Sequence, residues 1–159
     1  MKRPDYLKLA FAILGSQAAG FIGSLFTFSS VRGWYTTLER PAVNPPGWVF
    51  GPVWTTLYLL MGIAAYLVWQ KGMNKKEVRY ALGLFVGQLA LNAMWSMVFF
   101  GLHSPGGALV NIALLWLAII ATIQAFAKVS RPAAWLLVPY LLWVSFASYL
   151  NFAIWLLNS

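Results

Sequence analysis

Five long apolar runs, separated by short polar breaks, dominate the pattern of hydrophobic and polar positions along this chain of 159 residues. The runs cover approximately residues 9–28, 46–69, 80–102, 106–127 and 133–157. Each is long enough to cross the hydrocarbon core of a bilayer as a helix, which takes about 20 mainly apolar residues. The pattern therefore predicts an all-α membrane protein, in which residues 1–159 form a single domain, a bundle of five transmembrane helices.

The composition leads to the same class of protein. The chain is 61% hydrophobic and only 9% charged, whereas a soluble domain carries about 25% charged residues. The net charge of +8 would also suit a nucleic-acid-binding protein, but the cations lie at the ends of the apolar runs, where membrane topology explains them. We therefore expect a lipid bilayer and no nucleic acid as partner. The chain has no cysteine, which excludes disulfides and thiolate chemistry.

The distribution of the cations predicts an orientation. An odd number of spans places the two termini on opposite sides of the membrane. Nine cations fall on the side of the N-terminus: Lys2, Arg3, Lys8, Lys71, Lys75, Lys76, Arg79, Lys128 and Arg131. The other side holds Arg32 and Arg40. The positive-inside rule then predicts a cytoplasmic N-terminus and an outer C-terminus in a bacterial cell membrane, with a bacterial outer membrane as the alternative. The longest connection, residues 29–44, would face outward.

The segment RPAVNPPGWVFGPVW, residues 40–54, holds four prolines and two tryptophans. We expect Asn44 to cap the second helix and Pro46 to begin it. Pro52 would then remove one backbone hydrogen bond and bend the helix axis just before Trp54. The segment is thus either the rim of a pocket or only a proline-shaped turn.

Three polar residues share one face of the third predicted helix, since Gln88, Asn92 and Ser96 are spaced by four residues. Amides in hydrocarbon are costly unless they are paired, so this face should look into the bundle. The three residues either join helices to one another or line a ligand cavity.

A second candidate face lies on the fifth predicted helix, where Tyr140, Trp143, Ala147 and Leu150 fall on the same side. Two aromatic rings followed by small and aliphatic side chains would suit a flat apolar ligand with a polar edge. Ordinary packing between helices is the alternative.

Small residues form two stripes along the predicted helices. Gly83 and Gly87 make a GxxxG motif on the third helix, and Gly15, Ala19 and Gly23 make a stripe on the first. Such stripes let helices approach closely, either inside one bundle or between two copies of the chain in a homodimer.

The residues of ordinary catalysis are scarce. The three acids, Asp5, Glu39 and Glu77, lie outside the apolar runs, and the one histidine, His103, lies in a Pro/Gly turn. No acid–base pair, catalytic triad or metal cluster can be assembled at membrane depth, so we expect no required cofactor or metal. His103 is either a solvated loop residue or a lone ligand for a metal or haem.

Three segments together resemble one known family: WYTTLERPAVNPPGWVFGPVWTTLYLLMG, GQLALNAMWSMVFFG and PYLLWVSFASYLNF. They are similar, in order and spacing, to the TspO family. This family comprises the tryptophan-rich sensory proteins of bacteria and the mitochondrial translocator protein, or peripheral benzodiazepine receptor, of animals. The resemblance runs from the first predicted helix to Trp155.

The resemblance implies a five-helix bundle, often a homodimer, with a pocket open toward the long loop. In the family this pocket binds porphyrins such as protoporphyrin IX, haem, and synthetic isoquinoline and benzodiazepine ligands. The family's pocket residues correspond here to Trp34, Tyr35, Trp54, Asn92, Trp95, Trp143, Ala147 and Leu150.

Two departures from the family pattern are visible. Val43 stands where most members have a tryptophan, so we expect no stacking at that position. Tyr149 is followed by NFAIWLLNS, without the lysine or arginine of the animal cholesterol motif. Cholesterol recognition by that motif is therefore not expected.

Three functions follow as hypotheses. The first is a receptor or sensor for tetrapyrroles, regulating or transporting porphyrins or lipids, in which Asn92 and either Arg32 or Arg40 hold the ligand's carboxylates. The second is an enzyme that degrades porphyrin with light and oxygen, using Trp54 and Trp143 as redox partners. The third is a scaffold that binds lipid or a partner protein through its small-residue faces.

Overall fold

The computed structural model describes residues 3–159, and in that range it consists of helices and connecting turns. The elements are α1 (Tyr6–Val31), the 3₁₀ turn η1 (Trp34–Thr37), α2 (Gly47–Trp69), α3 (Lys76–Ser96), the π-helical turn η2 (Met97–Gly101), α4 (Pro105–Val129), α5 (Arg131–Leu136) and α6 (Val138–Leu157). Five stretches are long and apolar enough to cross a membrane, with α3 and η2 forming one of them and α5 and α6 another. The predicted all-α, five-span architecture is confirmed.

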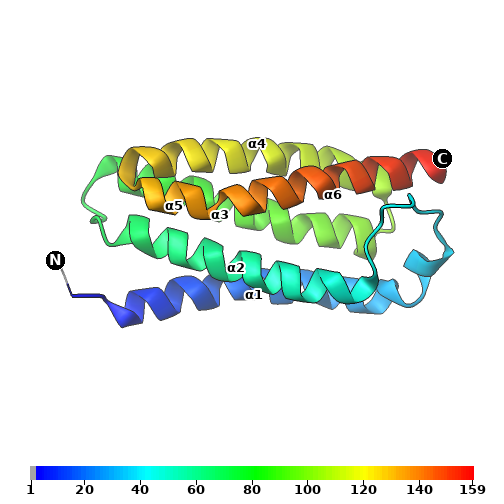
Figure 1. Ribbon diagram of the computed structural model, residues 1–159, viewed down its shortest axis with the longest axis horizontal. Coiled ribbons are helices and arrows are strands. Elements are labelled where there is room, and N and C mark those ends of the chain that lie inside the picture. The colour runs from blue at the N-terminus through cyan, green and yellow to red at the C-terminus, as the bar shows by residue number, and fades with distance from the viewer. Residues whose placement is uncertain (1–2) are drawn as a thin grey trace.

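The helices form one elongated bundle (Figure 1). α1 packs along α2 and α3, and α4 packs against α3 and α6. One end of the bundle, here called the basic end, holds the start of α1 and the α2–α3 turn (Figure 1). The opposite end, the loop end, holds residues 32–46 and the C-terminus. The cations predicted on the N-terminal side lie at the basic end, except Lys2, which is outside the described residues.

The fifth predicted helix differs from its prediction, because it is broken at Leu137 into α5 and α6. α5 begins as expected near Pro132, and the hydroxyl of Ser130 accepts a hydrogen bond from the backbone N–H of Ala133 at 3.4 Å. Pro139 has no N–H to donate to the carbonyl four residues earlier, so the helical ladder is interrupted there. The predicted span over residues 133–157 is confirmed, and the structure adds an interruption at Leu137.

The start of α2 also corrects a prediction. α2 begins at Gly47, immediately after Pro46, but Asn44 does not cap it. Instead the Asn44 side chain accepts a hydrogen bond from the Tyr35 hydroxyl at 3.2 Å and donates one to the Pro45 carbonyl at 3.3 Å. Asn44 therefore folds the loop onto itself, and α2 continues through Pro52.

The basic end is closely packed. A Cβ atom placed on Gly62 of α2 would lie 2.6 Å from the Cα atom of Ile13 in α1, so only glycine permits this approach. The surrounding core consists of fully buried, mostly aliphatic side chains, including Met61, Ala64, Val68, Val78, Ala81, Ile119 and Phe126.

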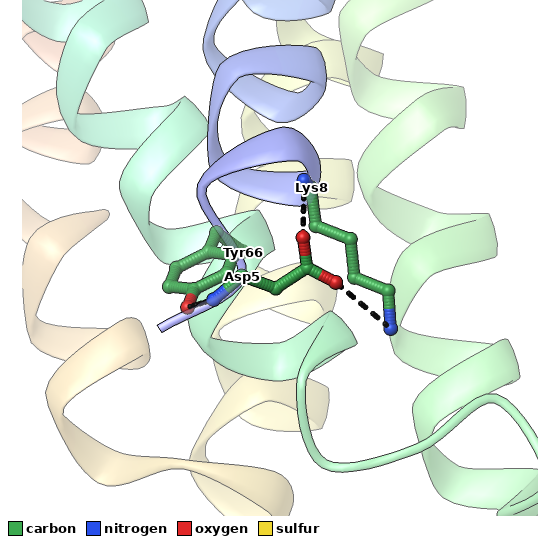
Figure 2. Close-up of polar contacts among 3 residues, drawn as sticks. All are labelled: Asp5, Lys8 and Tyr66. Carbon is green, nitrogen blue, oxygen red and sulfur yellow. Dashed lines mark hydrogen bonds and ion pairs between the residues drawn. The ribbon is translucent and has the colours of Figure 1, made fainter. Parts of the chain in front are cut away.

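Polar contacts fix the first turn of α1 to α2 (Figure 2). The backbone N–H of Asp5 donates to the Tyr66 hydroxyl at 3.0 Å, and the Asp5 carboxylate accepts from the backbone N–H of Lys8 at 3.1 Å. Asp5 is thus the N-cap of α1, which satisfies one of the free N–H groups at the helix start. The two helices are therefore joined at the basic end by both packing and hydrogen bonds.

Candidate functional site

A cavity of about 820 Å³ occupies the loop end of the bundle. Residues of α1, α2, α3, η2, α6 and the loop line it. A volume of this size suits a small organic ligand or a cofactor.

The structure divides the ten residues proposed for ligand binding into two groups. Six line the cavity: Tyr35, Trp54, Asn92, Trp95, Ala147 and Leu150. Four lie outside the lining: Trp34, Gln88, Tyr140 and Trp143. Tyr140 contacts Asn92 and Trp143 contacts Trp54, so both support the wall of the cavity from outside. Gln88 bonds to Tyr140, and Trp34 contacts the lining residue Phe99.

A chain of hydrogen bonds forms the floor of the cavity. The Tyr58 hydroxyl donates to Oδ1 of Asn92, and Nδ2 of Asn92 donates to the Tyr140 hydroxyl at 2.7 Å. The Tyr140 hydroxyl donates in turn to Oε1 of Gln88, also at 2.7 Å. Gln88 and Tyr140 are buried behind Asn92 and hold its amide in one orientation. The polar strip on α3 therefore both joins helices and lines the cavity.

Tyr58 is a cavity residue that the sequence reasoning missed. It lies four residues after Trp54, on the same face of α2. That spacing could have identified Tyr58 as a cavity residue. Its neighbours in the sequence are mainly apolar, however, as is typical of residues that only pack between helices.

Aromatic rings form the wall between α2 and α6. The Trp54 ring stacks on Tyr58 with 5.7 Å between centroids and meets the Trp143 ring edge-on at 6.4 Å. Phe50 also meets Trp143 edge-on, at 6.1 Å. Nε1 of Trp143 is buried and has no hydrogen-bond partner among the described residues. At this end, the two helices are thus bridged by long aromatic side chains.

The end of α3 and η2 form another wall of the cavity. Nε1 of Trp95 donates to Oδ1 of Asn151 at 2.9 Å, and Asn151 donates to the Pro105 carbonyl at 2.8 Å. The Trp95 ring also stacks on Phe99 at 5.1 Å. The π-helical turn carries Phe99 and Phe100 in the cavity lining, and such turns are frequent at functional sites.

Arg40, Tyr35 and Asn44 line the cavity at the loop end. The guanidinium of Arg40 lies over the Tyr35 ring, 5.0 Å from its centroid. In the described part of the chain, Arg40 is the one charged residue that lines the cavity, and Arg32 does not line it. Val43 is 58% exposed and lies outside the lining, so the departure from the family at this position does not alter the wall.

The end of α6 holds this loop in place. The backbone N–H of Glu39 donates to Oδ1 of Asn158 at 3.0 Å, and Nδ2 of Asn158 donates to the Glu39 carbonyl at 2.9 Å. This pair of hydrogen bonds connects segments that are 119 residues apart in the sequence.

His103 is exposed, yet it is bound to its neighbours. Its ring is parallel to that of Trp34, with 4.4 Å between centroids, and Nε2 lies 3.1 Å from the Ser30 hydroxyl. Ser30 donates its own hydrogen to the Phe100 carbonyl at 2.6 Å, so Nε2 carries the hydrogen shared with Ser30. His103 therefore joins α1, η1 and the α3–α4 turn, which the prediction of a solvated loop residue missed. In residues 3–159, no three His, Asp or Glu side chains come together as a metal site would require.

The two small-residue stripes have different surroundings. Gly23 of α1 is buried against Ser96 of α3, which places part of the first stripe inside the bundle. Gly15 is exposed. Gly83 and Gly87 line a shallow, open groove on α3, and a Cβ atom added to either would meet no other atom within 4 Å.

Residues 12–156 match the model of the TspO/MBR family. The chain is 53% identical to the tryptophan-rich protein TspO of Chlorobaculum tepidum, over 96% of each chain. It is 49% identical to that of Archaeoglobus fulgidus, over 98% of this chain and 99% of the relative. It is also 47% identical to the human translocator protein, over 85% of this chain and 80% of the relative.

The family match, the relatives and the five apolar spans agree with one another. The chain is an integral membrane protein that belongs to the TspO/MBR family.

Proposed function

We propose that this protein is a membrane receptor that binds a tetrapyrrole, such as protoporphyrin IX or haem, in the cavity at the loop end. A porphyrin is a flat apolar disc with carboxylates along one edge. The rings of Trp54 and Trp95 offer faces on which such a disc can stack. Isoquinoline and benzodiazepine-type ligands, which are also flat and apolar, would occupy the same cavity.

The observation that carries this proposal is the placement of Arg40. A single cation at the mouth of a cavity with otherwise uncharged walls favours an apolar ligand with an acidic edge. Arginine pairs with carboxylates through two parallel hydrogen bonds. We therefore assign the carboxylate-binding role to Arg40 rather than to Arg32. The apolar part of the ring would point toward Asn92.

Titration with protoporphyrin IX, followed by quenching of tryptophan fluorescence, tests the proposal. We expect saturable quenching by the wild-type protein and about tenfold weaker binding by Asn92→Leu. The substitution leaves the Tyr58 and Tyr140 hydroxyls on the cavity floor without their shared partner, so the floor loses its fixed shape. Trp143→Phe should weaken binding less, since Trp143 acts through Trp54. Trp116→Phe is the matched control, because Trp116 donates to Ser145 away from the cavity.

Two results would contradict this assignment. If Asn92→Leu bound protoporphyrin IX with wild-type affinity, the ligand would not contact the cavity floor. Quenching by the wild-type protein that never saturates would favour a scaffold that binds lipid or a partner protein.

A second function rests on the contacts of Trp54. Trp54 lines the cavity and contacts the rings of Tyr58, Tyr140 and Trp143. These oxidisable rings form a continuous cluster beside the proposed ligand, as light-driven degradation of a porphyrin would need. Loss of the Soret band during aerobic illumination should then be faster in the complex than for free porphyrin, and Trp54→Phe should slow it. Equal rates for bound and free porphyrin would rule out this enzyme activity.

We also propose that the protein forms a homodimer through α3. The exposed groove at Gly83 and Gly87 gives room for a close approach between two helices. Gly83→Leu should convert the dimer to a monomer, as measured by light scattering corrected for detergent. A wild-type protein that is already monomeric in a bilayer mimetic would contradict the assignment.

We propose a cytoplasmic basic end from the positive-inside rule. Because the chain has no cysteine, a single cysteine introduced at Lys75 or at Thr37 reports one end of the bundle without interference. A membrane-impermeant maleimide added to intact cells should modify Thr37→Cys and leave Lys75→Cys unmodified. The opposite pattern would invert the orientation.

A further inference from the structure

We propose that the cavity receives its ligand from the bilayer, through a lateral opening between α1 and α2, and not from water through the loop. The opening, here called the α1–α2 seam, is formed by Phe21, Ser24 and Phe28 of α1 and by Trp48, Gly51 and Thr55 of α2, all of which line the cavity. The inference rests on the proposed ligand-binding function and adds the source of the ligand.

Exposure differs sharply between the two sides of the cavity. On the seam side, Phe21, Phe28 and Trp48 are 66%, 75% and 75% exposed although they line the cavity. On the opposite side, Phe99 and Leu150 line the same cavity and are only 2% and 6% exposed. The opposite wall is therefore backed by protein, whereas the seam side faces the surroundings of the bundle.

These surroundings are hydrocarbon at the level of the seam. Phe21 lies about 22 Å from the start of α1, a helix of 26 residues that is roughly 39 Å long at 1.5 Å per residue. The hydrocarbon core of a bilayer is about 30 Å thick, so this position is well inside it. At the level of Phe21, the seam thus opens where an apolar ligand, and not water, is the available occupant.

The seam ends at a hydrogen bond on its basic-end side, and little blocks it toward the loop end. Nε2 of Gln17 donates to the Thr55 carbonyl at 3.1 Å and so joins the two helices below the opening. Deeper still, the contact of Gly62 with Ile13 closes α1 onto α2. One turn closer to the loop end than Thr55, Gly51 has no side chain. A Cβ atom added to Gly51 would meet nothing within 4 Å.

The loop, by contrast, is held in place by several contacts, although Arg40 itself is exposed. A ligand that entered there would have to break the paired hydrogen bonds between Glu39 and Asn158, the packing of Arg40 on Tyr35, and the bond from Tyr35 to Asn44. A ligand that entered through the seam would have to separate α1 from α2 only on the loop-end side of the Gln17–Thr55 hydrogen bond.

The chemistry of the ligand agrees with this route. An amphiphilic acid dissolved in the leaflet near the loop end keeps its carboxylate at the water interface and its apolar part in the hydrocarbon. Arg40 lies at the loop end of the cavity and Asn92 lies on its floor, so lateral movement through the seam would bring the carboxylate to Arg40 without turning the ligand over.

Kinetics in lipid vesicles test the route. We expect Gly51→Leu, which adds a side chain in the seam, to slow both association of protoporphyrin IX and its release to an albumin trap by about tenfold, a barrier increase of about 1.4 kcal/mol. The dissociation constant should change by less than about threefold, because a narrowed path slows entry and exit alike. Gly15→Leu is the matched control on α1: Gly15 is exposed and lies outside the cavity lining, so both rates should stay at wild-type values.

A second variant tests the competing route. Asn158→Ala removes the bonds to Glu39, so entry through the loop would become faster, whereas entry through the seam would proceed at the wild-type rate. Faster exchange in Asn158→Ala with unchanged exchange in Gly51→Leu would overturn the lateral route. Weaker affinity of Gly51→Leu at an unchanged association rate would also overturn it, since the new side chain would then fill the cavity and not the path. Non-saturable binding by the wild-type protein would instead contradict the proposed function itself, and the lateral route with it.

Discussion

The same helices build a closed core at the basic end of the bundle and a cavity at the loop end. At the basic end, α2 packs against α5, and glycine, alanine and aliphatic residues fill most of the interior beside the stacked rings of Phe85 and Phe126. At the loop end, the rings of Phe50, Trp54, Tyr140 and Trp143 bridge α2 and α6. Small side chains let helix backbones approach, whereas rings hold them apart and leave space between them. The choice between small and aromatic residues thus decides where the bundle is filled and where it is hollow.

Gly62→Leu tests the closed half and should have the largest effect. The added side chain would meet the backbone of Ile13, which cannot rotate away. We expect a loss of about 3 kcal/mol or more in the free energy of unfolding, seen as a large fall in the midpoint of thermal unfolding measured by circular dichroism. Gly15→Leu is the control, since a Cβ atom there meets nothing within 4 Å. Equal midpoints for the two variants would show that the basic end is not closely packed.

Arg40→Gln tests the open half by its effect on binding. We expect a loss of about 2 kcal/mol in protoporphyrin IX affinity, because a charge-assisted hydrogen bond contributes roughly 1.5–3 kcal/mol. The dimethyl ester of protoporphyrin IX has no carboxylate, so its affinity should be the same for the variant and the wild type. Arg32→Gln serves as the matched protein control, because Arg32 does not line the cavity. If Arg40→Gln lost the same affinity for the dimethyl ester, Arg40 would shape the cavity and would not recognise the charge of the ligand.

Tyr140→Phe tests the boundary between the two halves. The variant leaves Nδ2 of Asn92 and Oε1 of Gln88 without their hydrogen-bond partner. We expect a loss of about 1 kcal/mol in stability, since hydrogen bonds between membrane helices average below that value and removal here leaves two buried groups unpaired. Tyr149→Phe is the control, because Tyr149 is 52% exposed on the same helix. An unchanged midpoint of thermal unfolding in Tyr140→Phe would mean that the floor is not held by this network.

Asn158→Ala should have the smallest effect on stability. The two bonds to Glu39 are exposed, so their loss should cost about 0.5–1 kcal/mol. Limited proteolysis should nevertheless cut residues 32–46 faster, because this loop then lacks its attachment to α6. Asn74→Ala, at the opposite end, is the control. A loop that resists protease equally in both variants would show that Tyr35 and Arg40 are enough to hold it.

Helix positions followed from the sequence more closely than the residues of the site. The five spans were predicted within a few residues because hydropathy and length depend on the local sequence alone. The break at Leu137 was missed, since Pro139 is equally compatible with a helix start or a kink. Asn44 was assigned to a cap because that role is common after a loop, but the nearby Tyr35 hydroxyl competes for it.

The faces of single helices narrowed the list of candidate ligand-binding residues. They did not distinguish residues that line the cavity from residues that support its wall. Periodicity placed Gln88 and Asn92 on one face of α3, and in the structure one of them lines the cavity while the other holds it from behind. Which of two residues on one face meets the cavity depends on the distance and tilt of the opposite helix, and no local pattern contains that information.

The sequence by itself determined the class of the protein, the number of its spans, its family and the face of α3 that turns inward. These properties depend on composition, periodicity and the order of motifs along one chain. Only the tertiary structure decided that Arg40 and not Arg32 faces the cavity, that Tyr58 joins its floor, and that the seam side is open while the opposite wall is closed. These features arise where α1, α2, α6 and the loop meet, because the packing of each helix is set by side chains of the others.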